Sequence, residues 1–90
     1  MTQAFRSTRQ FDRDLKVAGK RGKNLEKIWA VIEKLLKREP LEPRHRPHRL
    51  SGDWSPCWEC HVEPDWLLVW QETDVELVLI RTGTHSDLFG

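Results

Sequence analysis

The sequence has very little sulfur: two cysteines, Cys57 and Cys60, and one methionine, Met1, among 90 residues. It also lacks any apolar run approaching the ~20 residues needed to cross a bilayer. Its N-terminal stretch turns polar and charged at once and shows no apolar core of a secretory signal. We therefore expect a cytoplasmic protein with no membrane partner, in which both cysteines are free thiols.

Basic residues are almost missing from the second half of the chain. Residues 51–90 contain one arginine against eight acidic residues, a net charge of −7. Residues 1–50 contain 14 of the 15 lysines and arginines against six acidic residues, a net charge of +8. A basic half can hold a phosphate backbone, but the same pattern is typical of a solvated helical face. Charge alone leaves both interpretations open.

The basic half predicts two helices. Residues 7–22 form the first, with Ser7 or Thr8 as the N-cap, and its apolar residues recur on one face. Residues 25–36 form the second. Its apolar stripe predicts a helix packed against a core and consists of Leu25, Ile28, Trp29, Ile32, Leu35 and Leu36. Prolines 40 and 43 close that helix, and residues 2–6 favour a short first strand carrying Phe5.

The second half predicts a sheet. After a basic, proline-rich loop over residues 41–56, three strand-like runs follow at residues 58–62, 66–71 and 75–82, separated by gaps that suit hairpins. The order of elements is β-α-α-β-β-β. Residues 1–90 are long enough for one small domain. We expect an α+β fold in which two N-terminal helices pack on one face of a small, mainly antiparallel sheet.

The segment Cys57-Trp58-Glu59-Cys60-His61 has the spacing of a c-type haem attachment site. Haem iron often takes a methionine as its second axial ligand, and Met1 is the only methionine. On a continuous strand Cys57 and Cys60 would face opposite sides, so they could not share a porphyrin, a zinc ion or an unstrained disulfide. Zinc with the remaining histidines as ligands is the other alternative. We expect no cofactor and no metal, and packing roles for both cysteines.

Residues suited to acid–base chemistry stand near the predicted strand ends. His48 lies in the basic loop, His61 ends the first long strand, Asp65 lies at the hairpin turn, and His85 lies in the C-terminal tail. Histidine titrates near neutral pH and can exchange a proton in the cell, and a His–Asp pair can divide the work of base and acid. Single histidines at strand ends are more often ordinary surface residues, so both interpretations stay open.

Three segments, "HRLSGDW", "CHVEPDWLLVW" and "RTGTHSDLF", resemble the signature segments of the YafQ branch of the RelE/ParE toxin superfamily. The helical half, "FDRDLKVAGKRGKNLEKIWAVIEKLL", extends the resemblance over nearly the whole chain. It implies the toxin of a type II toxin–antitoxin system, a ribosome-dependent endoribonuclease that cuts mRNA in the ribosomal A site. It also implies a cognate antitoxin protein as partner, and a RelE-like fold that agrees with the order above.

The resemblance also implies roles residue by residue. The proton-transfer groups would be His48, His61, Asp65 and His85. We prefer His85 as the general acid, and Asp65 as the base or as the group that orients a histidine. The expected RNA contacts are Arg46, Arg49 and Arg81 to phosphates, and Trp66 and Phe89 stacked on an unpaired base. No metal is required, because the 2′-OH of RNA is itself the nucleophile.

One departure from the family pattern keeps alternatives open. Cys57-Trp58 stands where family members often have Tyr-Arg, so this chain lacks an arginine that could hold the scissile phosphate. The protein could then be a catalytically weakened homologue that still binds antitoxin. The superfamily also includes toxins that poison DNA gyrase and cut nothing. The proposed acid–base groups are unaffected by the departure.

Overall fold

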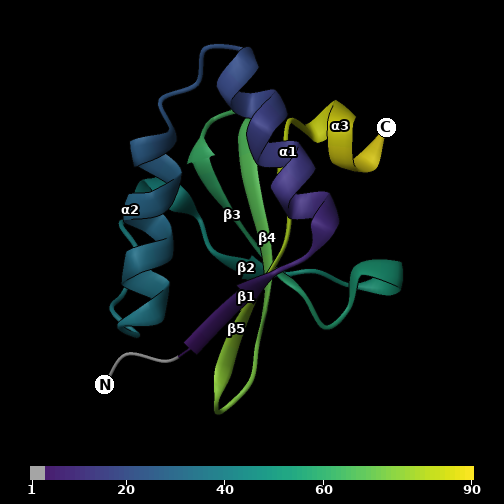
Figure 1. Ribbon diagram of the computed structural model, residues 1–90. Coiled ribbons are helices and arrows are strands. Elements are labelled where there is room, and N and C mark those ends of the chain that lie inside the picture. The colour runs from purple at the N-terminus through teal and green to yellow at the C-terminus, as the bar shows by residue number, and fades with distance from the viewer. Residues whose placement is uncertain (1–3) are drawn as a thin grey trace.

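The computed structural model describes residues 4–90, which form one five-stranded sheet with helices against it (Figure 1). The strands are β1 (Ala4–Ser7), β2 (His48–Arg49), β3 (Trp58–Glu63), β4 (Trp66–Glu72) and β5 (Glu76–Gly83). The α-helices are α1 (Arg9–Lys20), α2 (Leu25–Leu36) and α3 (His85–Phe89). The predicted α+β class is confirmed, and both N-terminal helices and the three long strands lie where expected. Of the strand predicted at residues 2–6, residues 2 and 3 lie outside the described part.

The sheet has the strand order β1-β5-β4-β3-β2. The β2–β3, β3–β4 and β4–β5 pairs are antiparallel. The edge strand β1 is parallel to β5, with Ala4 opposite Glu76, because α1, α2 and the whole hairpin series lie between them in the chain. This order brings the end of β5, and the tail that follows it, beside the β3–β4 turn.

Both N-terminal helices cover the same face of the sheet. Thr8 caps α1 by accepting from the backbone N–H of Phe11 at 2.9 Å, and Asn24 caps α2 in the same way. Helix residues Phe11, Ile28 and Ile32 pack in one core with strand residues such as Leu68 and Leu79. Trp29 was expected in this core but is 41% exposed, because it lies on the outer edge of α2 against the exposed Phe5.

The opposite face of the sheet has a smaller core. Leu67 and Val69 of β4 are buried there with Leu88 of α3 and the half-buried Trp54. Helix α3 was not predicted, although its capping box is legible in the sequence. Thr84 accepts from the backbone N–H of Asp87, and the Asp87 carboxylate accepts from the backbone N–H of Thr84. The C-terminal tail is therefore a helix packed on the sheet.

The basic loop over residues 41–56 is more ordered than expected. It contains two single 3₁₀ turns, η1 (Pro43–His45) and η2 (Gly52–Trp54), and between them the short strand β2. Because β2 pairs with β3, the loop is anchored along the sheet edge. No helix within residues 4–90 is long and apolar enough to cross a membrane.

The two cysteines lie on opposite faces of the sheet, as strand alternation predicts. Cys60 is buried in the core under the helices, whereas Cys57 packs with Leu67 and Val69 on the other face. Both are free thiols. Burial raises the pKa of the Cys60 thiol to about 12 and also raises the pKa of Cys57. Packing is thus the role that the structure gives both side chains.

Candidate active site

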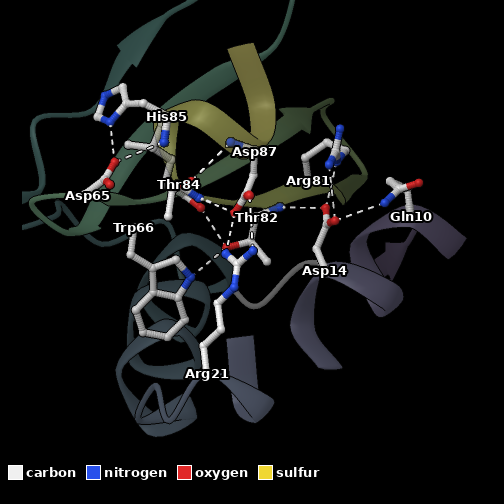
Figure 2. Close-up of polar contacts among 11 residues, drawn as sticks. Gln10, Asp14, Arg21, Asp65, Trp66, Arg81, Thr82, Thr84, His85 and Asp87 are labelled. Atoms are coloured by element: carbon white, nitrogen blue, oxygen red, sulfur yellow. Dashed lines mark hydrogen bonds and ion pairs between the residues drawn. The ribbon is translucent and has the colours of Figure 1, made fainter. Parts of the chain in front are cut away.

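Three of the four expected acid–base residues meet where β3, the β3–β4 turn and α3 come together. The rings of His61, on β3, and His85, the first residue of α3, have centroids 5.7 Å apart and are tilted by 50°. Nδ1 of His85 lies 2.7 Å from Oδ1 of Asp65, which is in the turn (Figure 2). Residues separated by some twenty positions in the chain therefore form one polar cluster.

Asp65 fixes the orientation of His85. Its Oδ1 accepts from the backbone N–H of His85 at 3.0 Å as well as from the ring. These two hydrogen bonds, the backbone one first, lower the pKa of the Asp65 carboxyl below its usual value. Because an ionised carboxylate can only accept, Nδ1 of His85 carries the proton in this contact. The ring nitrogen Nε2 is then the one that can meet a substrate.

His61 has a matching arrangement. Its Nδ1 lies 3.2 Å from the carbonyl oxygen of Pro64, an acceptor only, so Nδ1 is the protonated nitrogen. The neutral ring then has its lone pair on Nε2. The cluster thus holds the imidazole of His61, which can accept a proton, beside the imidazole of His85, whose Nδ1 is hydrogen-bonded to a carboxylate. This is a suitable arrangement for a base and an acid acting on one phosphodiester.

His48 forms a second pair on the same face. It lies directly opposite Glu59 in the β2–β3 ladder, and its Nε2 is 3.3 Å from Oε1 of that residue. Its Nδ1 lies 3.0 Å from the backbone oxygen of Arg46. Since Glu59 and His61 are two residues apart on β3, their side chains point to the same side of the sheet. Glu59 and His48 therefore lie on the same side of the sheet as His61.

Glu59 is a further candidate site residue, which the sequence pattern alone did not identify. It is only 4% exposed, and within residues 4–90 its Oε2 has no hydrogen-bond partner. Buried carboxylates are rare unless they are paired. The two-residue spacing to His61 on a predicted strand was the available signal, but the partner His48 could be found only once β2 was known.

Arg46 and Phe89 lie where RNA contacts are possible. Arg46 is exposed and lines a groove of about 550 Å³ that also includes His61. Within residues 4–90 its side chain has no acidic partner, whereas Lys27 and Arg44 in the same groove are paired with Glu63 and Glu42. Phe89 is 44% exposed, and its ring packs edge-on against Trp54.

Arg49 and Trp66 lie apart from the face that carries His48 and His61. Arg49 is opposite Trp58 in the ladder, and its guanidinium lies over that ring at 5.2 Å, on the helix-covered face away from His48. Trp66 is 1% exposed, and its Nε1 donates to Oγ1 of Thr82 at 2.9 Å. A buried ring cannot stack on a base, so Trp66 is a core residue here.

Arg81 is occupied by an internal carboxylate. Its Nε and Nη2 donate to the two carboxylate oxygens of Asp14 on α1 at 2.7 and 3.2 Å. This hydrogen bonding raises the pKa of the Arg81 guanidinium. Oδ2 of Asp14 also accepts from the backbone N–H of Thr82 (Figure 2). Arg81 thus ties α1 to β5, and phosphate would have to share it with Asp14.

Known proteins share the sequence and the fold of this chain. The family described as bacterial toxin of type II toxin–antitoxin system, YafQ, matches residues 3–90. The chain is 40% identical over 82 residues to mRNA interferase toxin YafQ of Escherichia coli strain K12. The aligned region covers 90% of this chain and 89% of the relative. The crystal structure of the E. coli DinJ-YafQ toxin-antitoxin complex matches with a TM-score of 0.92 at 36% identity, covering 100% of both chains.

A metal-bound toxin from Helicobacter pylori has the same fold, with a TM-score of 0.89 at 37% identity over 99% of this chain and 100% of that one. The family match extends over nearly all of the present chain, and the relative from E. coli is 40% identical to it over 90% of its length. This chain therefore belongs to the YafQ family of toxins of type II toxin–antitoxin systems.

Proposed function

We propose that this protein is an endoribonuclease that cleaves mRNA in the ribosomal A site and is held inactive by a cognate antitoxin. The name of the E. coli relative, an mRNA interferase, supports the activity, and the DinJ-YafQ complex supports the kind of partner. The single observation that carries the proposal is the convergence of His61, His85 and Asp65 at one end of the sheet.

The reaction needs a base, an acid and no external nucleophile. The base removes the proton of the 2′-OH, and the 2′-oxygen attacks the adjacent phosphorus. The bond to the 5′-oxygen breaks, and the acid protonates that oxygen as it leaves. The products are a 2′,3′-cyclic phosphate and a 5′-hydroxyl. Each positioned acid or base contributes typically 10²–10⁴-fold to the rate, and positioning contributes further.

We assign His61 as the base and His85 as the acid. His61 donates Nδ1–H to the Pro64 carbonyl and so offers the lone pair of Nε2 to the 2′-OH. His85 keeps its Nδ1–H on Asp65, and as the imidazolium it also carries an Nε2–H, which is the proton that it gives to the leaving oxygen. Both hydrogen bonds of Asp65 go to His85, so Asp65 is assigned as the orienting group.

The remaining contacts follow from position. We assign His48, held by Glu59, to proton transfer and its orientation beside His61. Arg46 contacts a neighbouring phosphate along the groove that it shares with His61. The exposed ring of Phe89 stacks on an unpaired base, an interaction worth ~1–3 kcal/mol. Trp54 supports that ring from one edge.

The test is single-turnover cleavage of mRNA on purified ribosomes by wild type, His85→Ala and a matched control, Ser86→Ala. Ser86 is the exposed neighbour on α3. We expect His85→Ala to lose cleavage and growth arrest while still binding the antitoxin, and Ser86→Ala to behave as wild type. Cleavage by His85→Ala at the wild-type rate would contradict the proposal. Growth arrest with intact mRNA and damaged DNA would instead indicate a gyrase poison.

Product ends and ribosome dependence complete the test. Mapped 5′ ends should carry hydroxyl groups, and 5′-phosphates would indicate attack by water. Omitting ribosomes should abolish cleavage of the same mRNA. Equal cleavage of free and ribosome-bound mRNA would contradict the A-site part of the proposal.

A metal has no step in this mechanism, although the H. pylori relative is described as metal-bound. Within residues 4–90, no three histidine, cysteine, aspartate or glutamate side chains converge as ligands for one ion. We assign all proton transfers to protein side chains, because the 2′-OH of RNA is itself the nucleophile. A chelator that leaves ribosomes intact should not change the cleavage rate, and a loss restored by one specific metal would overturn this assignment.

A further inference from the structure

Helix α3 carries His85 but is too short to hold its own position. It has five residues, and isolated helices of that length are not stable in water. The side chains of His85 and Asp65 are 54% and 65% exposed, so their contact is well screened. The buried Leu88 and the capping box fix the helix locally. The placement of His85 also needs a connection to a rigid part of the molecule.

That connection is the ion pair between Arg21 and Asp87 (Figure 2). Arg21 caps the C-terminus of α1. Its Nη1 donates to Oδ2 of Asp87 at 2.6 Å and its Nη2 donates to Oδ1 at 3.3 Å. Bidentate pairs of this kind are geometrically specific. The arginine holds the pKa of the Asp87 carboxyl well below its usual range, and the pKa of Arg21 is raised in turn.

Asp87 is positioned to transmit this contact to His85. The Oδ2 atom that binds Arg21 also accepts from the backbone N–H of Thr84, immediately before His85. A Cβ placed on Gly83 would lie 3.0 Å from both Cβ and Oδ2 of Asp87. The backbone at Gly83 is therefore packed closely against the side chain of Asp87. A shift of Asp87 would also shift the segment that presents His85.

Helix α1 is a rigid support. Its N-cap residue Thr8 bonds the β5 backbone at Leu79 and Ile80, and Asp14 bonds Arg81 and Thr82 of the same strand. Helix α1 is thus fixed to β5 at two points before it reaches Arg21. The guanidinium of Arg21 extends this fixed framework to α3.

We propose that Arg21 is a positioning residue for His85, acting through Asp87 to hold α3 in the orientation that lets His85 protonate the leaving oxygen. The inference rests on the proposed function of His85. Arg21 touches neither substrate nor reacting atoms in this role. Misplacement of a reacting group by about 1 Å can lower a rate ~100-fold, so a loosened α3 lowers the rate of the chemical step rather than the affinity for mRNA.

The experiment compares Arg21→Gln, Asp87→Asn and the double variant in single-turnover cleavage of mRNA on ribosomes. We expect at least tenfold lower kcat for each single variant, KM within about twofold of wild type, and a double variant no slower than the worse single one. Arg21→Lys, which keeps the charge, should recover part of the rate. Arg13→Gln, on the exposed side of α1, should equal wild type.

A direct contact between Arg21 and RNA phosphate gives the opposite pattern. Asp87→Asn would then free Arg21 and leave cleavage unchanged or faster, whereas Arg21→Gln would raise KM. That pattern would overturn the proposal. Amide hydrogen exchange gives a readout independent of activity: exchange at Leu88 and Phe89 should accelerate in Arg21→Gln, and unchanged exchange would also overturn the proposal.

His85→Ala in the same assay distinguishes the proposed function of His85 from the proposed positioning role of Arg21. If His85→Ala is inactive and Arg21→Gln is fully active, the proposed function stands and this inference fails. If His85→Ala is fully active, the assignment of His85 itself fails, whatever Arg21→Gln does.

Discussion

Asp65 holds His85 by two hydrogen bonds to one oxygen: Oδ1 accepts the backbone N–H at 3.0 Å and the ring Nδ1 at 2.7 Å. The first bond places the start of α3, and the second sets the ring within it. A single side chain in a turn therefore contacts both the start of α3 and the ring of His85, and the ring contact determines which nitrogen is presented.

Replacing Asp65 with asparagine tests whether its charge is needed. The amide side chain would keep the shape and one acceptor oxygen but lose the negative charge that pairs with Nδ1 of His85. We expect Asp65→Asn to slow single-turnover mRNA cleavage at least tenfold, because it weakens the orientation of His85, a group of the kind that contributes typically 10²–10⁴-fold. The free energy of unfolding should change little, since the contact is exposed. A rate equal to wild type would remove Asp65 from the mechanism.

Glu59 offers a second test on the same face. Glu59→Gln keeps the side-chain volume but removes the charge 3.3 Å from Nε2 of His48. We expect slower cleavage with the protein still folded, because His48 loses the carboxylate that holds it. The exposed Asp53→Asn is the charge-matched control. If both variants cleave mRNA equally fast, Glu59 contributes to packing only.

Thr82 is expected to contribute to stability through its buried hydroxyl. It accepts from Nε1 of Trp66 at 2.9 Å and donates to the carbonyl of Leu67 at 2.6 Å. Thr82→Val leaves Nε1 of the buried Trp66 without this acceptor and removes the donor to the Leu67 carbonyl, at a cost of about 1–3 kcal/mol. Urea unfolding measures this loss. In the background Trp66→Phe, which has no N–H, the same substitution should cost less; equal costs would show that the two side chains are not coupled.

His45 should make the fold sensitive to mild acid. Its ring is buried in η1, and Nδ1 has no partner within residues 4–90. Burial first, then the charge of Arg44, lowers the pKa of His45 below its ordinary value. The unfolded chain, with a pKa near ~6.5, therefore takes up a proton before the folded chain does. The free energy of unfolding falls as pH drops below about 6.5 and stops falling below the folded-state pKa.

The variant His45→Leu removes this proton linkage while keeping an apolar side chain in the same place. Its unfolding free energy, measured in urea between pH 7.5 and 5, should depend less on pH than that of wild type. Parallel curves for the two proteins would exclude His45 as the source.

The cysteines should differ in reactivity. Thiolate is the reactive form, and Cys60 is fully buried with its pKa raised to about 12, whereas Cys57 is only partly buried. Iodoacetamide should therefore label Cys57 slowly and leave Cys60 unlabelled until urea unfolds the chain. Mass spectrometry under non-reducing conditions should find no Cys57–Cys60 disulfide. Rapid labelling of Cys60 in the native protein would show that β3 opens.

Local sequence pattern was enough for most of the fold. The apolar stripe from Leu25 to Leu36 predicted α2 with its observed bounds, and alternation along β3 predicted that Cys57 and Cys60 lie on opposite faces. The same alternation separates the neighbours His48 and Arg49. The sequence predicts a loop over residues 41–56 and therefore does not separate the two side chains. Strand β2 exists only because it pairs with β3.

Long-range pairing decided the rest of the site. Trp66 looked available to RNA, but its strand, β4, is central and covered on both faces, so the ring is buried. Arg81 looked free for phosphate, but Asp14, 67 residues earlier, takes its guanidinium. The tail after β5, for which no element was predicted, is a helix that Arg21 holds to α1 and Leu88 holds to the sheet.

By itself the sequence determined the two N-terminal helices, the three long strands, the helix-covered face and the family, because periodicity, caps and motifs are properties of neighbouring residues. Only the tertiary structure decided which polar groups meet. The convergence of His61, Asp65 and His85, and the pairing of Arg21 with Asp87, depend on β4 lying between β3 and β5 and on α1 lying against β5. Strand order is set by the packing of the whole chain, and no local pattern encodes it.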